Sequence, residues 1–232
     1  MKQIEFVNNE IYHIYNRGVE KRDIFLGRKD KFRFMHSLFE FNDEIAARRP
    51  MYEVGLRKIE GNQIRIRKIK KPLVDILVFC LMPNHYHLLL RQREDGGITK
   101  FMRKLGTGYT NYFNLKYKRS GFLFQGRFKA SLINNDNYFL YMPYYIHFNP
   151  LDLVDPLWRE SKVKDFNKII EFLESYRWSS FLDYIGQKNF PTVTQRDFLL
   201  SSYGDTSDYK REAINWLRGV DFSKIDKLIL EN

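Results

Sequence analysis

Two histidines separated by one residue, His85 and His87, are the pair of side chains in this sequence best suited to chemistry. In an extended segment successive side chains point to opposite faces, so both imidazoles would project together while Tyr86 projects the other way. Two neutral imidazoles side by side can bind one divalent cation. An isolated pair of this kind on a half-exposed strand usually binds nothing. Here apolar residues at 74–81 and 88–90 flank the pair, so it interrupts a sheet that is expected to be buried and remains a candidate metal site.

A second group of polar side chains lies on an expected helix. The helix is predicted to run to Asn149, where Pro150 stops it, and Asn135 or Asp136 would cap its first turn. Residues four apart share one face of a helix, so Tyr145 and Asn149 would project together. A phenol and an amide would then face one site. Taken alone the pattern is ordinary, because tyrosine-rich helices usually serve packing and Asn before Pro is a common helix end.

The composition indicates a folded protein with a polyanionic partner. The chain has 232 residues, of which 44% are hydrophobic, and this is enough for a substantial core. Lys and Arg number 39 against 28 Asp and Glu, which gives a net charge of +11 and a pI near 9.5. Such a charge favours nucleic acid over an acidic protein. Aromatic residues make up 16%, and rings among basic residues suit the stacking of unpaired bases, although many rings must belong to the core.

Cysteine usage and hydropathy point to a reducing compartment. Cys80 is the only cysteine and lies in an apolar run, so we expect a buried thiol without a disulfide. The first residues form no apolar signal region, and the longest apolar run is too short to span a bilayer. We therefore expect a cytoplasmic protein that is neither exported nor embedded in a membrane.

The order of expected elements indicates an α+β fold. The expected strands are 11–15, 74–81, the histidine segment after Pro83, and 121–133, with a basic β-hairpin at 51–69; the expected helices are 30–47, 98–118 and the one that ends at Asn149. We predict a ferredoxin-like, mostly antiparallel sheet with helices on one face, plus a C-terminal helical appendage. The predicted boundary separates a core at 1–160 from an extension at 161–232.

Four ordered tracts resemble one known family. They are Met82-Pro83-Asn84-His85-Tyr86-His87-Leu88-Leu89, Phe124-Gln125-Gly126-Arg127-Phe128-Lys129, Tyr145-Ile146-His147-Phe148-Asn149-Pro150 and Tyr176-Arg177-Trp178-Ser179-Ser180-Phe181. Together they resemble the REP-associated tyrosine transposases, which are single-tyrosine HUH transposases and relatives of the small insertion-sequence transposases that act on single-stranded DNA. The resemblance starts near Tyr12 and continues to about Gly186, so it covers most of the chain.

The resemblance implies a metal-dependent enzyme that nicks and rejoins single-stranded DNA at hairpin-flanked repeats. It implies that His85 and His87 are paired metal ligands, that Asn149 is the polar third ligand, and that Tyr145 is the nucleophile. The implied intermediate is a phosphotyrosine at the DNA 5′ end, and the implied ion is Mg²⁺ or Mn²⁺. Coordination chemistry alone leaves the ion open, because imidazoles suit metals such as Zn²⁺ while oxygen ligands suit Mg²⁺ and Mn²⁺.

Five basic residues are expected to bind DNA. Arg17 follows the first strand, and Arg127 and Lys129 lie in the strand expected before the tyrosine helix. Arg103 and Lys104 lie on the basic side of the helix expected before that strand. Ion pairs within the protein, or a solvated helix face, are the alternatives for each. The expected partner is single-stranded DNA with hairpin or repeat sequences, bound by a monomer or a homodimer.

Two other functions stay open on the sequence alone. A non-catalytic protein derived from a transposase would bind single strands or hairpins with a steep salt dependence and cleave nothing. A metal-dependent hydrolase would use activated water, leave a free 5′ phosphate and survive loss of the tyrosine. The presence of His85, His87 and Tyr145 together favours an active transposase over a decayed one.

Overall fold

The computed structural model describes residues 4–44, 71–160, 163 and 165–219. The hairpin predicted at 51–69 and the predicted end of the first helix at Ala47 lie outside these residues. Within the described ranges, no helix is both long and apolar enough to cross a membrane.

In the described residues, four strands form one antiparallel sheet in the order β2-β3-β1-β4. The strands are β1 (Ile11–Arg17), β2 (Val74–Leu81), β3 (His85–Gln92) and β4 (Lys129–Leu132). Among the residues that the structure describes, one α-helix lies between β1 and β2 and another between β3 and β4, so the order is strand, helix, strand, strand, helix, strand. This order and the antiparallel pairing are those of a ferredoxin-like sheet, and the predicted fold class is confirmed.

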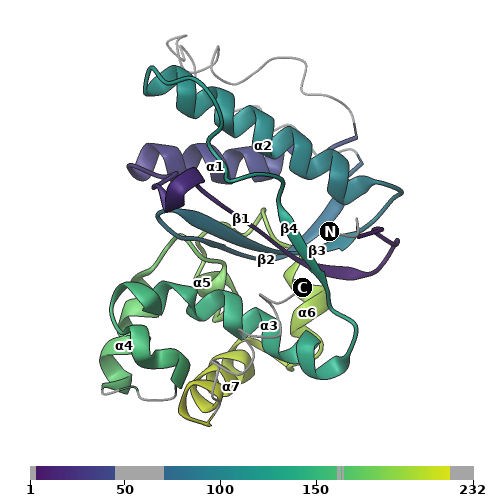
Figure 1. Cartoon of the computed structure of the whole chain (residues 1–232). Helices are drawn as coiled ribbons and strands as arrows, with labels where there is room; N and C mark the ends of the chain where they lie inside the picture. Colours follow the sequence, from purple (N-terminus) through teal and green to yellow (C-terminus); the bar gives the residue numbers. More distant parts are fainter. Residues whose placement is uncertain (1–3, 45–70, 161–162, 164, 220–232) are drawn as a thin grey trace, which may run out of the picture.

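Helices cover both faces of the sheet (Figure 1). On one face lie α1 (Arg28–Phe41) and α2 (Gly97–Lys116), and on the other lies α3 (Asp136–Phe148) with the C-terminal helices. Helices were predicted on one face of the sheet, and α1 and α2 form such a layer. The layer of α3 and the C-terminal helices on the other face was not predicted. The C-terminal helices are α4 (Phe166–Ser175), α5 (Phe181–Tyr184), α6 (Arg196–Leu200) and α7 (Thr206–Gly219). Short 3-10 turns lie at Val19–Lys21, Asn149–Leu153 and Pro156–Glu160.

Side-chain alternation along β1 and β3 separates the two faces of the sheet. Tyr12, Ile14 and Tyr86 belong to the apolar core beneath α1 and α2. His13 points the opposite way and lies buried against Tyr145 of α3. β2 is buried along its whole length, as expected for a strand with helices above and below it. One face of the sheet is thus apolar, whereas the other carries polar side chains where α3 crosses it.

The helix α3 is fixed at its start and near its end. Asn135 accepts a hydrogen bond from the backbone N–H of Tyr138, which confirms the predicted cap. Near the end, the two ring nitrogens of His147 lie 2.7 Å from the Tyr209 hydroxyl of α7 and 2.7 Å from the Ser180 hydroxyl. These bonds join α3 to the C-terminal helices. The boundary proposed between residues 160 and 161 stays a prediction.

One prediction about local structure is wrong and another is confirmed. The strand predicted at 121–133 is limited to β4, because the chain bends at residues 125–127. Before the bend, Phe124 forms only an isolated bridge with Gly18, next to the end of β1. The predicted end of the tyrosine helix is confirmed, because α3 ends at Phe148 with Asn149 as its C-cap. The 3-10 turn Asn149–Leu153, which contains Pro150, follows it directly. A proline fits the first turn of a helix because the N–H that it lacks would have no partner there.

Candidate active site

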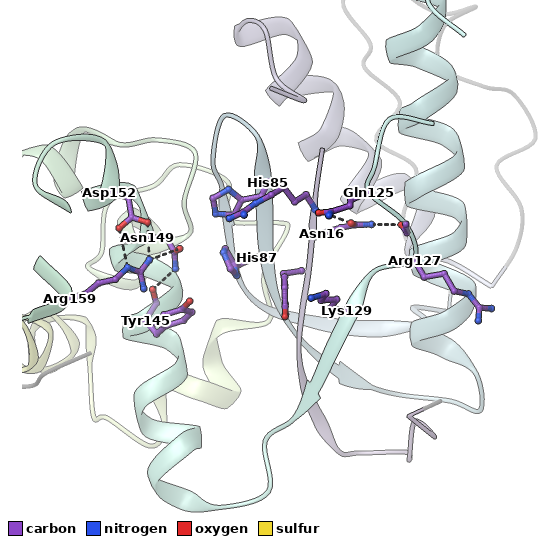
Figure 2. Close-up of a pocket in the computed structure, with 13 residues that line it drawn as sticks. Asn16, His85, His87, Gln125, Arg127, Lys129, Tyr145, Asn149, Asp152 and Arg159 are labelled. Atoms are coloured by element: carbon purple, nitrogen blue, oxygen red, sulfur yellow. Dashed lines mark hydrogen bonds and ion pairs between the residues drawn. The ribbon is translucent and has the colours of Figure 1, made fainter. Parts of the chain in front are cut away.

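A pocket of about 450 Å³ lies between β3, the end of β1 and α3. His85 and His87 line it from the sheet, and Tyr145 and Asn149 line it from α3 and the turn that follows (Figure 2). The residues predicted as metal ligands and nucleophile therefore share one pocket, although they lie far apart in the sequence. The other lining residues are Tyr15, Asn16, Arg17, Gln125, Gly126, Arg127, Lys129, Asp152 and Arg159.

His87 is held by a histidine from the neighbouring strand. Its Nδ1 lies 2.8 Å from Nε2 of His13, and both side chains are buried. The two rings stack with 5.1 Å between their centroids. Among the described residues, His87 forms its hydrogen bond through Nδ1. Its Nε2 is therefore the nitrogen that could bind a ligand.

His85 has a tautomer fixed by its neighbour. Its Nδ1 lies 2.6 Å from Oδ1 of Asn84, and the amide of Asn84 is oriented because its Nδ2 donates to the carbonyl of Lys21. An amide oxygen can only accept, so Nδ1 of His85 carries the hydrogen and Nε2 has the lone pair. Metal-binding histidines usually have this arrangement, in which the second ring nitrogen donates to an oxygen.

Burial keeps both imidazoles neutral at pH 7. Loss of solvation, followed by the positive charge of Arg17, lowers the pKa of His85 to about 4, against the opposing effect of Asp152. Loss of solvation also lowers the pKa of His87 well below 6.5, and the neighbouring His85 and His13 lower it further. An imidazole must be neutral to bind a metal, so neither ring has to lose a proton first at this pH.

Tyr145 lies against the histidines of the sheet. Its side chain is 4% exposed, and its ring centroid lies 6.0 Å from that of His87 and 6.0 Å from that of His13, in edge contacts. Tyr141, one turn earlier, stacks on it at 5.9 Å, as the four-residue spacing predicts. Nδ2 of Asn149 donates to the backbone carbonyl of Tyr145 at 2.7 Å. The phenol and the amide thus lie in the same site.

An ion pair in the pocket was missed by sequence reasoning. Nη2 of Arg159 lies 2.9 Å from Oδ2 of Asp152 and 3.3 Å from Oδ1 of Asn149 (Figure 2). The guanidinium also lies over the Tyr145 ring, 5.3 Å from its centroid. Asp152 lies in the 3-10 turn that follows α3, so the four-residue spacing that groups Tyr145 with Asn149 did not extend to it. No signal in the sequence identifies Arg159.

The basic residues predicted to bind DNA fall into two groups. Arg17, Arg127 and Lys129 line the pocket beside the histidines. Arg103 and Lys104 lie on α2, which covers the other face of the sheet, and the Lys104 amine donates to a backbone carbonyl just beyond α1. The structure therefore brings the first group to the candidate site and leaves the second group away from it. The DNA-binding role of all five stays a prediction.

The donor atoms of the pocket fit a divalent cation. Nε2 of His85 has a lone pair, and Nε2 of His87 has one in the tautomer whose hydrogen is on Nδ1. Oδ1 of Asn149 keeps a second lone pair beside the bond that it accepts from Arg159. Within the described part of the chain, no cluster of three His, Cys, Asp or Glu side chains is placed to hold a metal ion. A cation would therefore depend on the imidazole pair and the amide, with water or a substrate oxygen completing its shell.

Comparisons with known proteins point to transposases. Residues 45–149 match the family described as "Transposase IS200 like". Among solved structures, that of a REP-associated tyrosine transposase bound to a REP hairpin is similar to this chain, with a TM-score of 0.50, 14% sequence identity, and coverage of 80% of this chain and 85% of that chain. At this identity the likeness shows a shared fold. No curated protein matches the chain.

Proposed function

We propose that this chain, whose residues 45–149 match the family described as "Transposase IS200 like", cuts and rejoins single-stranded DNA with Tyr145 as the nucleophile. A transposase role rests on the family match and the shared fold. The finer proposal is supported above all by one observation, that Tyr145 shares a pocket with His85 and His87 and contacts the ring of His87. These side chains come from β3 and α3, so the fold alone brings them together.

We assign His85, His87 and Asn149 as the residues that would hold a divalent cation, Mg²⁺ or Mn²⁺. When bound, such an ion polarises an oxygen of the scissile phosphate and offsets the negative charge that develops there. The tautomer of His85 and the low pKa of both imidazoles favour this assignment, because they leave nitrogen lone pairs available at pH 7. Arg159 would release or share the Asn149 oxygen when the amide binds the ion.

Tyr145 would attack the phosphorus atom. A bond forms between the phenolic oxygen and phosphorus while the bond from phosphorus to the 3′ oxygen breaks, which leaves a 5′-phosphotyrosine and a free 3′ hydroxyl. A second 3′ hydroxyl can reverse the step, so joining needs no external energy source. A tyrosine ordinarily has a pKa of about 10. The guanidinium of Arg159, 5.3 Å from the ring centroid, would favour the phenolate during the attack.

The pocket also suits the backbone of a DNA strand. Arg17, Arg127 and Lys129 line it, and basic side chains of this kind neutralise phosphates. The solved relative is bound to a REP hairpin. We extend this to the present chain and propose a single-stranded DNA substrate that carries a hairpin beside the cleavage site.

Labelled DNA tests this proposal. Single-stranded oligonucleotides with hairpins are incubated with the protein and Mn²⁺, with the label at the 3′ end in one set and at the 5′ end in the other. We expect the 3′ label to stay on the protein under denaturing conditions and the 5′ label to leave on a shorter strand with a 3′ hydroxyl. Tyr145→Phe should abolish the complex. Tyr141→Phe, which loses a hydroxyl on the same helix face, should retain it.

Two outcomes would favour the alternative functions. A free 5′ phosphate that forms equally well with Tyr145→Phe would identify a hydrolase that uses water. Salt-sensitive binding without cleavage, in either Mg²⁺ or Mn²⁺, would identify a DNA-binding protein derived from a transposase.

A further inference from the structure

His13 is a buried histidine that the proposed chemistry does not yet use. It lies in β1, its side chain is 0% exposed, and its Nε2 lies 2.8 Å from Nδ1 of His87. Its ring stacks on Tyr15 with 5.2 Å between centroids and meets the ring of Tyr145 at 6.0 Å in an edge contact. His13 therefore touches one proposed metal ligand and the proposed nucleophile.

The hydrogen bond between the two imidazoles can run in two directions. A neutral imidazole carries one N–H, on either of its nitrogens. If His13 donates, Nδ1 of His87 accepts and the hydrogen of His87 sits on Nε2, which leaves no lone pair for a cation. If His87 donates from Nδ1, its Nε2 lone pair is available to the pocket. Cation binding at His87 therefore requires His13 to act as the acceptor.

The other nitrogen of His13 is unusual. Its Nδ1 is buried, and no residue in the described part of the chain forms a hydrogen bond with it. A buried polar atom without a partner is unfavourable for folding, whichever tautomer is present. An apolar side chain would avoid this cost in a strand that is otherwise well packed. The hydrogen bond between Nε2 of His13 and His87 therefore explains the presence of an imidazole at this position better than packing does.

We propose that His13 is a positioning residue that fixes the ring and the tautomer of His87 for cation binding. This inference rests on the proposed function, because it assigns a partner to one of the proposed ligands. His85 shows the same arrangement with a different acceptor, since its Nδ1 donates to Oδ1 of Asn84. Each of the two imidazoles then turns Nδ1–H toward a fixed acceptor and leaves Nε2 for the ion.

Two substitutions separate the hydrogen bond from ring packing. His13→Phe keeps a ring beside Tyr145 but removes the acceptor, whereas His13→Gln keeps an acceptor near the position of Nε2. We measure Mn²⁺ binding to the metal-free protein by the EPR signal of free Mn²⁺. We expect the affinity to fall about tenfold to a hundredfold in His13→Phe and to stay within about threefold of the wild type in His13→Gln. Equal affinities in all three proteins, or equal losses in both variants, would overturn the role of His13.

Nitrogen NMR gives a second readout that packing alone does not change. With Mg²⁺ bound, we expect the hydrogen of His87 to sit on Nδ1, and a hydrogen on Nε2 would contradict the inference. His85→Ala serves as the control for the site itself. A wild-type protein that binds no Mn²⁺, or that binds it equally after His85→Ala, contradicts the proposed metal site and with it the role of His13. If the wild type binds Mn²⁺ tightly and His13→Phe binds it equally well, only the role of His13 is contradicted.

Discussion

Two buried histidine sites lie on the same side of the sheet and differ in how their nitrogens are used. His147 has both ring nitrogens in hydrogen bonds, to the hydroxyls of Tyr209 and Ser180, each at 2.7 Å. His13 and His87 share a single hydrogen bond, and His87 lines a pocket that also contains Tyr145. Burial lowers the pKa of His147 and of His13 alike, in each case to about 3.

The difference shows that burial and a low pKa do not by themselves identify a functional histidine. Both properties follow from the loss of solvation, which acts on any imidazole inside a protein. The two sites differ in whether the second ring nitrogen of the histidine forms a hydrogen bond. His147 uses it to join α3 to the C-terminal helices, whereas His87 lines the pocket and its Nε2 makes no hydrogen bond among the described residues. Four predictions test this distinction, from the largest expected effect to the smallest.

The largest effect should appear in the rate of covalent adduct formation. His87→Ala removes one of two imidazoles, and the rate should fall about a hundredfold or more, because metal stabilisation of the phosphate is worth several kcal/mol. His147→Gln keeps a polar amide in the packing site and should leave the rate within about threefold. Single-turnover kinetics on labelled DNA measure both. A folded His147→Gln protein with a loss as large as that of His87→Ala would remove the distinction.

The second effect should appear in stability. His147→Phe leaves the hydroxyls of Tyr209 and Ser180 without their imidazole partner, so we expect the free energy of unfolding to fall by about 2–4 kcal/mol. His85→Ala should cost less than about 1 kcal/mol, because this ring is partly exposed in the pocket. Urea denaturation of the metal-free proteins gives both values. The reverse ranking would show that the pocket histidine, and not His147, holds the fold together.

The third effect concerns the pH dependence of stability. The pKa of His147 is about 3 in the folded protein and has an ordinary value of 6.5. The unfolded chain therefore takes up a proton first, and stability that is present above pH 6.5 is lost as the pH falls toward about 3. His147→Gln should reduce the slope of unfolding free energy against pH by up to about 1.4 kcal/mol per pH unit in this window. If the unfolding free energies of the metal-free wild type and of His147→Gln changed equally with pH, the pH dependence could not be assigned to His147.

The smallest effect compares the pocket with the α2 layer in DNA binding. Arg17→Gln removes one cation that lines the pocket and should reduce the slope of log affinity against log salt by about 0.7. Arg103→Gln should leave the slope unchanged, because α2 covers the other face of the sheet. Fluorescence anisotropy with a labelled single strand measures both. Equal changes would place α2 in the DNA-binding surface, as its charge predicts.

Local sequence patterns predicted those parts of the site that lie on one element. Alternation along a strand placed His85 and His87 together, and the four-residue spacing of a helix placed Tyr145 with Asn149. The role of His13 was not predictable in this way. It reaches His87 because β1 pairs with β3, and nothing within 11–17 specifies that pairing.

The same reason explains the other omissions and errors. Asp152 and Arg159 meet beside the tyrosine through turns that follow Pro150, where helical spacing no longer applied. The predicted strand at 121–133 is interrupted because the chain bends between β4 and the isolated bridge that Phe124 forms with Gly18. Patterns with periods of two or about four residues describe single elements, whereas these features depend on contacts between elements.

Mass spectrometry of the protein after reaction with DNA tests the central claim most directly. The protein is incubated with hairpin-bearing single-stranded DNA and Mn²⁺ in water enriched in oxygen-18, and the adduct is then digested with a nuclease and a protease. We predict a nucleotide 5′ phosphate on the side chain of Tyr145 and no oxygen-18 in that phosphate. A nucleotide on a different residue, or a free 5′ phosphate that carries oxygen-18 while Tyr145 stays unmodified, would contradict the account.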